Sequence, residues 1–254
     1  MKNIIINADD FGKNKDINYA IMDLMDSNLC LDTTLLMNFE DSAHAANLAI
    51  SKNKGDHVGI HLNLTEGFPL TQTIRNESRF CSEEGLFHFK RYKRIVSLTT
   101  SEKKAVIEEL TSQIHLCREL GISISHADSH NHIHEEPGIF FLLLDILKKE
   151  KIPFLRLTNN IGKTSLLNKL YRSSYNTILN FNNLAGTNYF GSTANLTNYK
   201  KIIERNSLVE LMIHPGQILD NQIYDVFSNE NLSLILPGII NGNNLISYNQ
   251  LVRR

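Results

Sequence analysis

The chain opens with KNIIINADDFG (residues 2–12), a short apolar run that meets three polar side chains almost at once. Four of the five residues from Ile4 to Ala8 are apolar, which is typical of a strand buried on both faces, and Phe11-Gly12 marks a turn after it. Asp9 and Asp10 stand between the strand and the turn. The stretch therefore predicts a buried strand with two carboxylates at its carboxyl end.

Strand-like and helix-like segments alternate after this first strand. Apolar residues at helical spacing predict helices over 16–29, 41–51, 101–120 and 137–149, and strands are expected over 31–39, 57–64, 122–128, 154–157 and 208–213. Ser101 is expected to cap the longest helix and Gly121 to end it. Residues 159–199 are expected to form helix and loop, 229–236 a helix and 245–248 a last short strand.

This alternation predicts an α/β fold, in the form of a single-domain, distorted TIM-barrel-like (β/α) barrel of mostly parallel strands over residues 1–254. No repeat or low-complexity linker divides the chain, and one irregular excursion interrupts the pattern at about residues 66–100. Parallel α/β folds place their sites at the carboxyl ends of the strands. Candidate functional residues are therefore expected at those ends.

The composition excludes several classes of protein. Lys and Arg number 26 against 27 Asp and Glu, so no basic excess exists for a nucleic-acid backbone. The longest apolar run, residues 139–147, is shorter than the roughly 20 residues of a membrane span. The apolar start is too short for a signal-peptide core, and three widely spaced cysteines argue against disulfides. We expect a cytoplasmic protein with no transmembrane segment and no nucleic-acid partner.

The most informative stretch is HADSHNHIH at residues 126–134, where the fourth predicted strand ends. Its ionisable residues all fall on even positions, so they point to one face if the backbone stays extended. Four imidazoles and one carboxylate within nine residues are typical of a mixed nitrogen and oxygen site for a divalent metal ion. A solvated, histidine-rich loop is the alternative.

Further acids and imidazoles stand near the ends of other strands: Asp9 and Asp10 after the first, His61 in the third, and His214 before a Pro-Gly turn. Two adjacent carboxylates resist joint ionisation unless a cation is near, which connects Asp9 and Asp10 with the histidines. One acid could ligate a metal while the other acts as a general base, and His214 could act as a general acid. The alternatives are capping or turn roles for the acids and for His214, and a satisfied core position for His61.

Four segments resemble one known family in their order and spacing. They are NADDFG (7–12), GIHLNLTEG (59–67), SHADSHNHIH (125–134) and ELMIHPG (210–216), with LRL (155–157) as a weaker match. On these motifs the chain resembles the YdjC-like carbohydrate deacetylases, which include chitooligosaccharide deacetylases, from residue 3 to about residue 217. Residues 159–199 and the C-terminal segment carry little of this signature.

The resemblance implies a metal-dependent hydrolase on a barrel-like α/β fold that removes N-acetyl groups from amino sugars. Carried over residue by residue, it implies Asp10, His61 and His130 as ligands of one divalent metal ion. It also implies Asp9 as the general base and His214 as the general acid, although the roles of Asp9 and Asp10 could be exchanged.

Five further residues are candidates for substrate contact or for support of the ligands: Asp128, His132, His134, Arg156 and Asn63. Asp128 could accept a hydrogen bond from a ligand imidazole. His132 and His134 could line the pocket. Arg156 could contact an anionic or hydroxyl-rich group, or it could form a structural salt bridge.

The sequence does not decide which ion or which substrate the protein binds. Mixed Asp and His sites take magnesium, zinc or manganese. The excursion could place Phe80, Phe87, Phe89 and Tyr92 against sugar faces or use them as a small accessory core. A metal-dependent phosphoesterase or cyclic amide hydrolase on the same fold is the alternative function, followed by a non-catalytic sugar-binding protein. The expected partner is an oligosaccharide or another amino-sugar substrate, and a homodimer is considered as the assembly.

Overall fold

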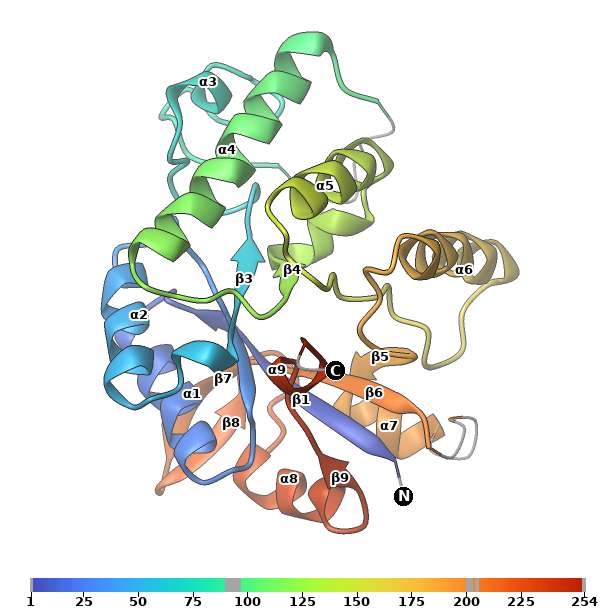
Figure 1. Ribbon diagram of the computed structural model, residues 1–254. Coiled ribbons are helices and arrows are strands. Elements are labelled where there is room, and N and C mark those ends of the chain that lie inside the picture. Colours follow the sequence, from blue (N-terminus) through green and yellow to red (C-terminus); the bar gives the residue numbers. More distant parts are fainter. Residues whose placement is uncertain (1, 90–96, 200–202, 204–205, 253–254) are drawn as a thin grey trace.

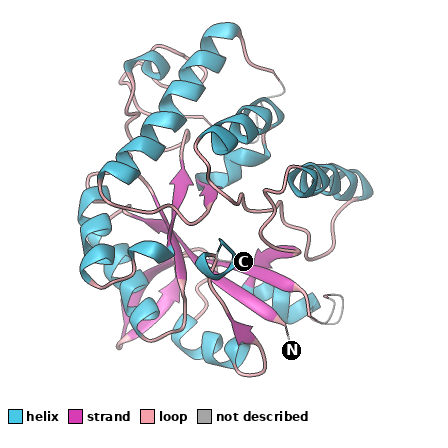
Figure 2. Ribbon diagram, viewed as in Figure 1, coloured by secondary structure: helices cyan, strands magenta, loops and turns pink. Residues whose placement is uncertain are grey.

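The computed structural model describes residues 2–89, 97–199, 203 and 206–252. Strands gather at the centre of the molecule and helices lie around them (Figure 1, Figure 2). The strands of the main sheet are β1 (Asn3–Phe11), β2 (Asp32–Leu35), β3 (Val58–Leu62), β4 (Ala127–Ser129), β5 (Tyr189–Ser192), β6 (Leu208–Ile213) and β9 (Asn244–Leu245). Their order is β4-β3-β2-β1-β6-β5, with β9 paired to the start of β1, and all these pairings are parallel.

Single-residue bridges complete the sheet into a ring. Leu155 pairs in parallel with Ala127 of β4 on one side and with Ala185, just before β5, on the other. The Leu155 amide donates to the Leu184 carbonyl at 2.8 Å, and the Arg156 amide donates to the Ala127 carbonyl at 2.9 Å. The prediction of a distorted α/β barrel of mostly parallel strands is therefore confirmed.

Helices cover the strands. They are α1 (Lys15–Asp26), α2 (Ser42–Ser51), α3 (Gln72–Arg75), α4 (Thr100–Glu119), α5 (Pro137–Lys149), α6 (Leu166–Phe181), α7 (Thr193–Tyr199), α8 (Leu232–Ile240) and α9 (Asn249–Val252). In Figure 1, α4 and α5 lie side by side, with α4 next to β3. An antiparallel hairpin of β7 (Pro215–Leu219) and β8 (Gln222–Asp225) packs against α1. Of the helices in the described ranges, none is both long and apolar enough to cross a bilayer.

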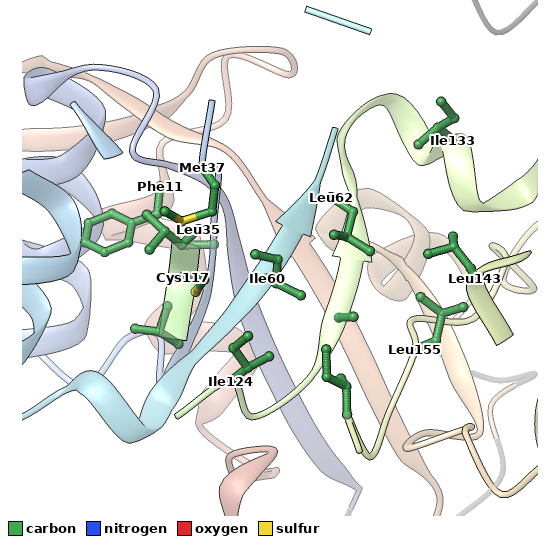
Figure 3. Close-up of a cluster of buried hydrophobic side chains, with 14 of the residues drawn as sticks. Phe11, Leu35, Met37, Ile60, Leu62, Cys117, Ile124, Ile133, Leu143 and Leu155 are labelled. Carbon is green, nitrogen blue, oxygen red and sulfur yellow. The ribbon is translucent and has the colours of Figure 1, made fainter. Parts of the chain in front are cut away.

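The apolar core fixes the direction in which the polar side chains of β3 point. Ile60 and Leu62 are fully buried, and Figure 3 shows them in a cluster that includes Leu35 and Leu155. His61 stands between Ile60 and Leu62 in the strand, so its side chain leaves from the opposite face. The alternation of apolar and polar residues in this strand therefore places His61 on the face turned away from that cluster.

Most predicted segments are present. The helix over 137–149 and the strand over 208–213 are confirmed residue for residue as α5 and β6. The other predicted helices of the first half are present as α1, α2 and α4 with slightly different bounds. Their apolar faces are buried against the sheet, as the helical spacing of their apolar residues predicts.

Two predicted strands are wrong in length, and one observed strand lies where helix and loop were predicted. Of the strand predicted over 122–128, only Ala127 and Asp128 belong to β4 (Ala127–Ser129), although the Ser125 amide also donates to the Val58 carbonyl at 3.0 Å. The strand predicted over 154–157 is reduced to the bridge at Leu155. Tyr189–Ser192, expected within helix and loop, forms β5 because the edge of β6 is open to it.

Thr99, and not the predicted Ser101, caps α4. The Thr99 hydroxyl accepts a hydrogen bond from the Glu102 amide at 3.2 Å, and the Thr99 amide donates to the Glu102 carboxylate at 2.7 Å. This reciprocal capping box starts the helix earlier than the apolar pattern indicates. Gly121 follows the helix with a φ of 86°, as a glycine that ends a helix should.

The described part of the predicted excursion contains α3 and an antiparallel bridge between Cys81 and Phe87. The rings of Phe80, Phe87 and Phe89 are buried in the apolar core. They are therefore packing residues, as the accessory-core alternative holds, and do not present their faces to a sugar. Tyr92 lies outside the described residues.

Candidate metal centre

Three side chains from different strands meet at the carboxyl end of the sheet: Asp10, His61 and His130. Asp10 stands near the end of β1, His61 in β3, and His130 directly after β4. His61 Nε2 lies 3.3 Å from Asp10 Oδ1, and His130 Nδ1 lies 2.9 Å from the same oxygen. One ligand atom from each residue lies within 4.8 Å of the others, and all three residues are buried. The cluster is therefore compact enough to hold one cation.

The backbone at the end of β1 explains how both aspartates reach one pocket. In a regular strand, Asp9 and Asp10 would point to opposite faces. Asp10 has a left-handed φ of 68°, and the pairing of β1 with β2 shifts its register between Ala8 and Phe11. Both aspartates consequently line the same small pocket. Backbone strain at a non-glycine residue is often found at functional sites.

Asp128 and Thr34 hold the His61 ring from behind. His61 Nδ1 is 2.6 Å from Asp128 Oδ1 and 3.2 Å from Thr34 Oγ1, so that Nε2 is the nitrogen near Asp10. A carboxylate behind a ligand imidazole fixes the orientation and the tautomer of the ring. Burial alone would lower the pKa of His61, but the Asp128 and Asp10 carboxylates raise it to about 10. The two carboxylates therefore favour a positive charge at the position of the His61 ring.

His130 lies between two carboxylates, of which Glu66 is missing from the predicted site residues. His130 Nε2 is 2.8 Å from Glu66 Oε2, and Lys13 Nζ is 3.0 Å from that same oxygen. The hydrogen bond with His130 and the Lys13 charge outweigh burial and lower the pKa of Glu66 to about 2. The signal in the sequence is the place of Glu66 in GIHLNLTEG, close to His61.

The donor set fits one divalent cation. Two imidazole nitrogens and one carboxylate oxygen are common ligands of zinc and other first-row metals, and three protein ligands leave room for water. Burial would raise the pKa of Asp10, but hydrogen bonds with His130 and His61 hold it far below its usual range. Asp10 is thus a buried anion, and His61 and His130 lie where they can ligate the same cation.

Among the residues that the structure describes, two other groups of three side chains bring ligand atoms within 4.8 Å of one another. The first consists of Asp9, His61 and Asp128, and the second of His132, His134 and Glu135. In the first group, both carboxylates already contact the buried guanidinium described next, which opposes a second cation.

Arg156 lies beneath the pocket and is fully buried. Its guanidinium donates to both oxygens of Asp9 at 2.6 and 2.7 Å, to Glu210 at 2.7 Å, and lies 2.7 Å from Asp128. These contacts are those of the structural salt bridge that was the alternative for Arg156, and they leave contact with substrate a prediction. Burial opposes the ionisation of Asp9, but the Arg156 charge holds the pKa of that carboxyl well below its usual range.

His214 lies across the pocket from Asp9. His214 Nε2 is 3.9 Å from Asp9 Oδ2, and its Nδ1 is 3.8 Å from Asp225 Oδ2. The His214 amide donates to Asp225 Oδ2 at 2.7 Å, and the Phe227 ring packs edge-on against the imidazole. Asp225 is missing from the predicted site residues because it belongs to the β7–β8 hairpin, which the sequence pattern does not reveal. Burial would raise the pKa of Asp225, but hydrogen bonds with His214 lower it to about 2.

The even-numbered side chains of residues 126–134 do not share one face, contrary to the prediction from an extended backbone. The extended backbone ends at Ser129, and His130–Glu135 form a 3-10 turn that contains two left-handed residues. His132 lines the pocket, whereas the buried His134 ring lies with Nδ1 2.6 Å from Ser129 Oγ. The left-handed turn is the physical reason for the separation of these rings.

Asn63 supports a loop of the site. Its side-chain amide donates to Asn38 Oδ1 at 2.9 Å and to the Glu66 carbonyl at 2.7 Å, while its oxygen accepts from the Thr65 amide at 2.8 Å. Asn63 is absent from the described residues that line the pocket. Its contacts thus hold the segment that carries Glu66.

The pocket at this cluster is small. Its volume is about 80 Å³, and it is lined by Asp9, Asp10, His61, Ser129, His130, Asn131, His132, Met212, His214 and Phe227. Pockets that enclose a whole ligand usually measure roughly 300 Å³ or more. This pocket is therefore suited to one small group at the end of a ligand.

The chain is similar to known proteins over most of its length. A profile of the family described as YdjC-like protein matches residues 3–235. A carbohydrate deacetylase of Clostridium beijerinckii is 31% identical over 220 residues, which cover 87% of this chain and 83% of that protein. A carbohydrate deacetylase of Vibrio cholerae is 28% identical over 214 residues, or 84% and 78% of the two chains. The crystal structure of a provisionally named cellobiose-phosphate cleavage protein from Enterococcus faecalis V583 superposes with a TM-score of 0.72 at 20% identity, covering 98% of both chains, and this likeness concerns the fold.

Proposed function

The chain belongs to the YdjC-like protein family, and from this premise we propose that it is a metal-dependent hydrolase that removes N-acetyl groups from amino sugars. Relatives that match most of the chain are named carbohydrate deacetylase. The observation that carries the proposal is the arrangement around one pocket of a compact Asp and His cluster, the Asp9 carboxylate and the His214 imidazole.

Asp10, His61 and His130 would hold the ion, for which magnesium, zinc and manganese are the candidates. A divalent ion at these residues supplies polarisation of an acetamide carbonyl and acidification of a water molecule. Asp10 contacts both imidazoles, whereas Asp9 contacts Arg156. This difference in partners favours Asp10 as the ligand and Asp9 as the base.

Asp9 is proposed as the general base. Arg156 donates to both of its oxygens and Asn7 donates to Oδ1 at 2.8 Å, so the carboxylate is held in a fixed orientation as an anion. Because Arg156 keeps the pKa of Asp9 low, Asp9 can accept a proton only from a strongly acidified water. Such a water requires a cation close by, which connects Asp9 with the neighbouring Asp10.

His214 is proposed as the general acid that gives a proton to the leaving amine. Asp225 accepts from the His214 amide and lies near Nδ1, which orients the imidazole with Nε2 toward Asp9. An acid and a base that reach the same acetamide group can act in the same turnover. The 3.9 Å between His214 Nε2 and Asp9 Oδ2 is short enough for both to reach one acetamide group.

The rest of the substrate would lie outside the small pocket. A second cavity of about 720 Å³ runs along α6. It is lined by Leu157, Asn159, Asn160, Gly162, Lys163, Thr164, Lys169, Arg172, Ser173, Asn176, Thr177, Asn180 and Asn188, most of which carry an amide, a hydroxyl or a positive charge. At its edge, Asn160 Oδ1 accepts from the Phe190 amide at 2.9 Å, and the Phe190 ring contacts His132 of the small pocket. We therefore place further sugar units of the substrate in this cavity, which has the volume of a ligand site.

The proposal is tested by acetate release from N-acetylglucosamine oligomers. Metal-stripped protein receives magnesium, manganese, zinc, cobalt or nickel singly, and release is expected with at least one ion. His130→Ala should abolish release in a folded protein, because it removes one of three ligands. His115→Ala is the matched control, since His115 is an exposed histidine of α4 that pairs with Glu150.

Two outcomes would redirect the assignment. Turnover of a phosphodiester but of no acetamide would favour a phosphoesterase, since the same ligands serve that reaction. Binding of sugar without binding of any metal would favour a non-catalytic sugar-binding protein. Oligomers longer than the monosaccharide should show a lower KM if the cavity along α6 holds sugar units.

A homodimer, a cytoplasmic location and a single domain over residues 1–254 stay predictions. Sedimentation equilibrium of the purified chain measures the assembly. Limited proteolysis followed by mass spectrometry tests the single domain, because two domains joined by a linker would be cut between them.

A further inference from the structure

The chain end returns to the sheet after α8, beyond the residues that match the family. β9 pairs with the start of β1 (Figure 1), and the Ile246 amide donates to the Ile4 carbonyl at 2.9 Å. Tyr248 of this segment is buried, with 1% of its surface exposed. Its ring stacks on His126 with the ring centres 4.0 Å apart, and its hydroxyl donates to Glu210 Oε2 at 2.7 Å. A Cβ on Gly186 would come within 2.7 Å of the ring, so glycine leaves the space that this ring fills.

Glu210 connects Tyr248 to the guanidinium below the pocket. Its second oxygen, Oε1, accepts from Arg156 Nε at 2.7 Å, while the two terminal nitrogens of Arg156 donate to Asp9. A guanidinium is planar and rigid, so fixing its Nε edge fixes the direction of the other edge. The orientation of Asp9 thus depends on Glu210, and the orientation of Glu210 depends on the Tyr248 hydroxyl.

We propose that Tyr248 and Glu210 are positioning residues, which set the direction of the Asp9 carboxylate through Arg156. The proposal rests on the proposed function of Asp9 as the base. Buried ion pairs add little net stability compared with apolar residues of the same shape, so packing alone does not call for a buried carboxylate at Glu210. Neither residue is among the described residues that line the pocket; Glu210 contacts Arg156 directly, and Tyr248 contacts Glu210.

Two variants test the proposal by kinetics. Glu210→Gln and Tyr248→Phe should lower kcat by roughly 10-fold and roughly 3-fold, with KM and metal content unchanged, because a small displacement of a reacting group slows the chemical step. The matched control is Ser247→Ala. Ser247 is equally buried and donates to Asp32, but it has no contact with Glu210 or Arg156. It should lose stability while keeping kcat.

A purely structural role predicts a different pattern. All three variants would then lower the melting temperature, and kcat per folded molecule would stay at the wild-type value. That result, or an equal loss of kcat in Ser247→Ala, would overturn the proposal. Restoration of kcat by Glu210→Asp beyond the level of Glu210→Gln would support it, since aspartate restores the charge next to Arg156.

Crystal structures of wild type and Tyr248→Phe give a readout that does not depend on the reaction. Loss of the hydroxyl should turn Glu210 and break at least one of the two contacts between Arg156 and Asp9. If both contacts persist at their wild-type distances, the proposal is wrong whatever the enzyme acts on. Absence of acetate release in the wild type, together with a displaced Asp9 in the variant, would instead overturn the proposed function and keep the positioning role.

Discussion

Asp128 accepts from His61 Nδ1 at 2.6 Å, and this single carboxylate decides which nitrogen of His61 faces Asp10. Asp128→Asn removes the charge behind the ligand ring. Loss of such a partner typically weakens metal affinity by about 10- to 100-fold, and we expect that loss here. Equilibrium dialysis against a metal buffer measures it. Asp145→Asn, which changes an exposed acid of α5, should leave the affinity as in the wild type.

Arg156 balances three buried carboxylates, so its removal should cost more stability than the loss of a surface arginine. Arg156→Met leaves Asp9, Asp128 and Glu210 buried without their counter-charge, at an expected cost of about 3–5 kcal/mol. Urea unfolding monitored by circular dichroism provides the value.

Arg118→Met is the comparison for that measurement, because the ion pair of Arg118 with Glu150 is partly exposed. Exposed pairs contribute about 0–1 kcal/mol. Equal losses in the two variants would contradict the view that the carboxylates depend on Arg156.

Asp225 should make stability depend on pH in the acid range. Against the effect of burial, hydrogen bonds with His214 lower its pKa from 3.8 to about 2. The unfolded chain therefore takes up the proton at a higher pH than the folded chain does. The stabilisation by Asp225 is complete above pH 3.8 and is lost as the pH falls toward 2. The difference in unfolding free energy between wild type and Asp225→Asn should shrink over that interval, and a constant difference would contradict this account.

At the scale of elements, Thr99 and Ser101 at the start of α4 have different roles. Thr99→Ala removes the side-chain half of the capping box and should cost about 0.5–2 kcal/mol. Ser101→Ala, two residues further, should change stability by less than about 0.5 kcal/mol, because Ser101 is exposed and its hydroxyl, 3.2 Å from that of Thr99, is not the capping group. Thermal unfolding of the two variants side by side measures both.

The elements that could be predicted are those whose pattern is complete within one segment. α5 carries an apolar stripe and a proline in its first turn, and both signals are local. β4 and β5 could not be bounded from the sequence, because their lengths depend on how far β3 and β6 extend beside them. The 3-10 turn after β4 escaped prediction for another reason, since asparagine and histidine adopt left-handed angles without a specific sequence signal.

At the scale of the whole molecule, some residues of the candidate site could be predicted from the sequence and others could not. Asp10, His61 and His130 were predictable because each stands at or near the end of its own strand and matches a family motif. Glu66 and Asp225 were not, because their importance arises only where separate loops meet. The partners of a buried guanidinium likewise depend on which carboxylates the ring of strands brings to it.

The single bridges at Leu155 have a consequence for the motions of the barrel. β1 and β6 pair over six residues, whereas Leu155 holds each neighbour by one bridge, so the ring should open first at this place. In hydrogen–deuterium exchange, the Leu155 amide should exchange at least about tenfold faster than the Ile6 amide in β1. The ion pairs of Arg156 with Asp9, Asp128 and Glu210 then hold the barrel together at the position where its strand pairing is shortest. Each opening of the barrel at Leu155 would also free the Asp9 carboxylate from Arg156. The same guanidinium would therefore control both the local opening of the barrel and the orientation of the proposed base.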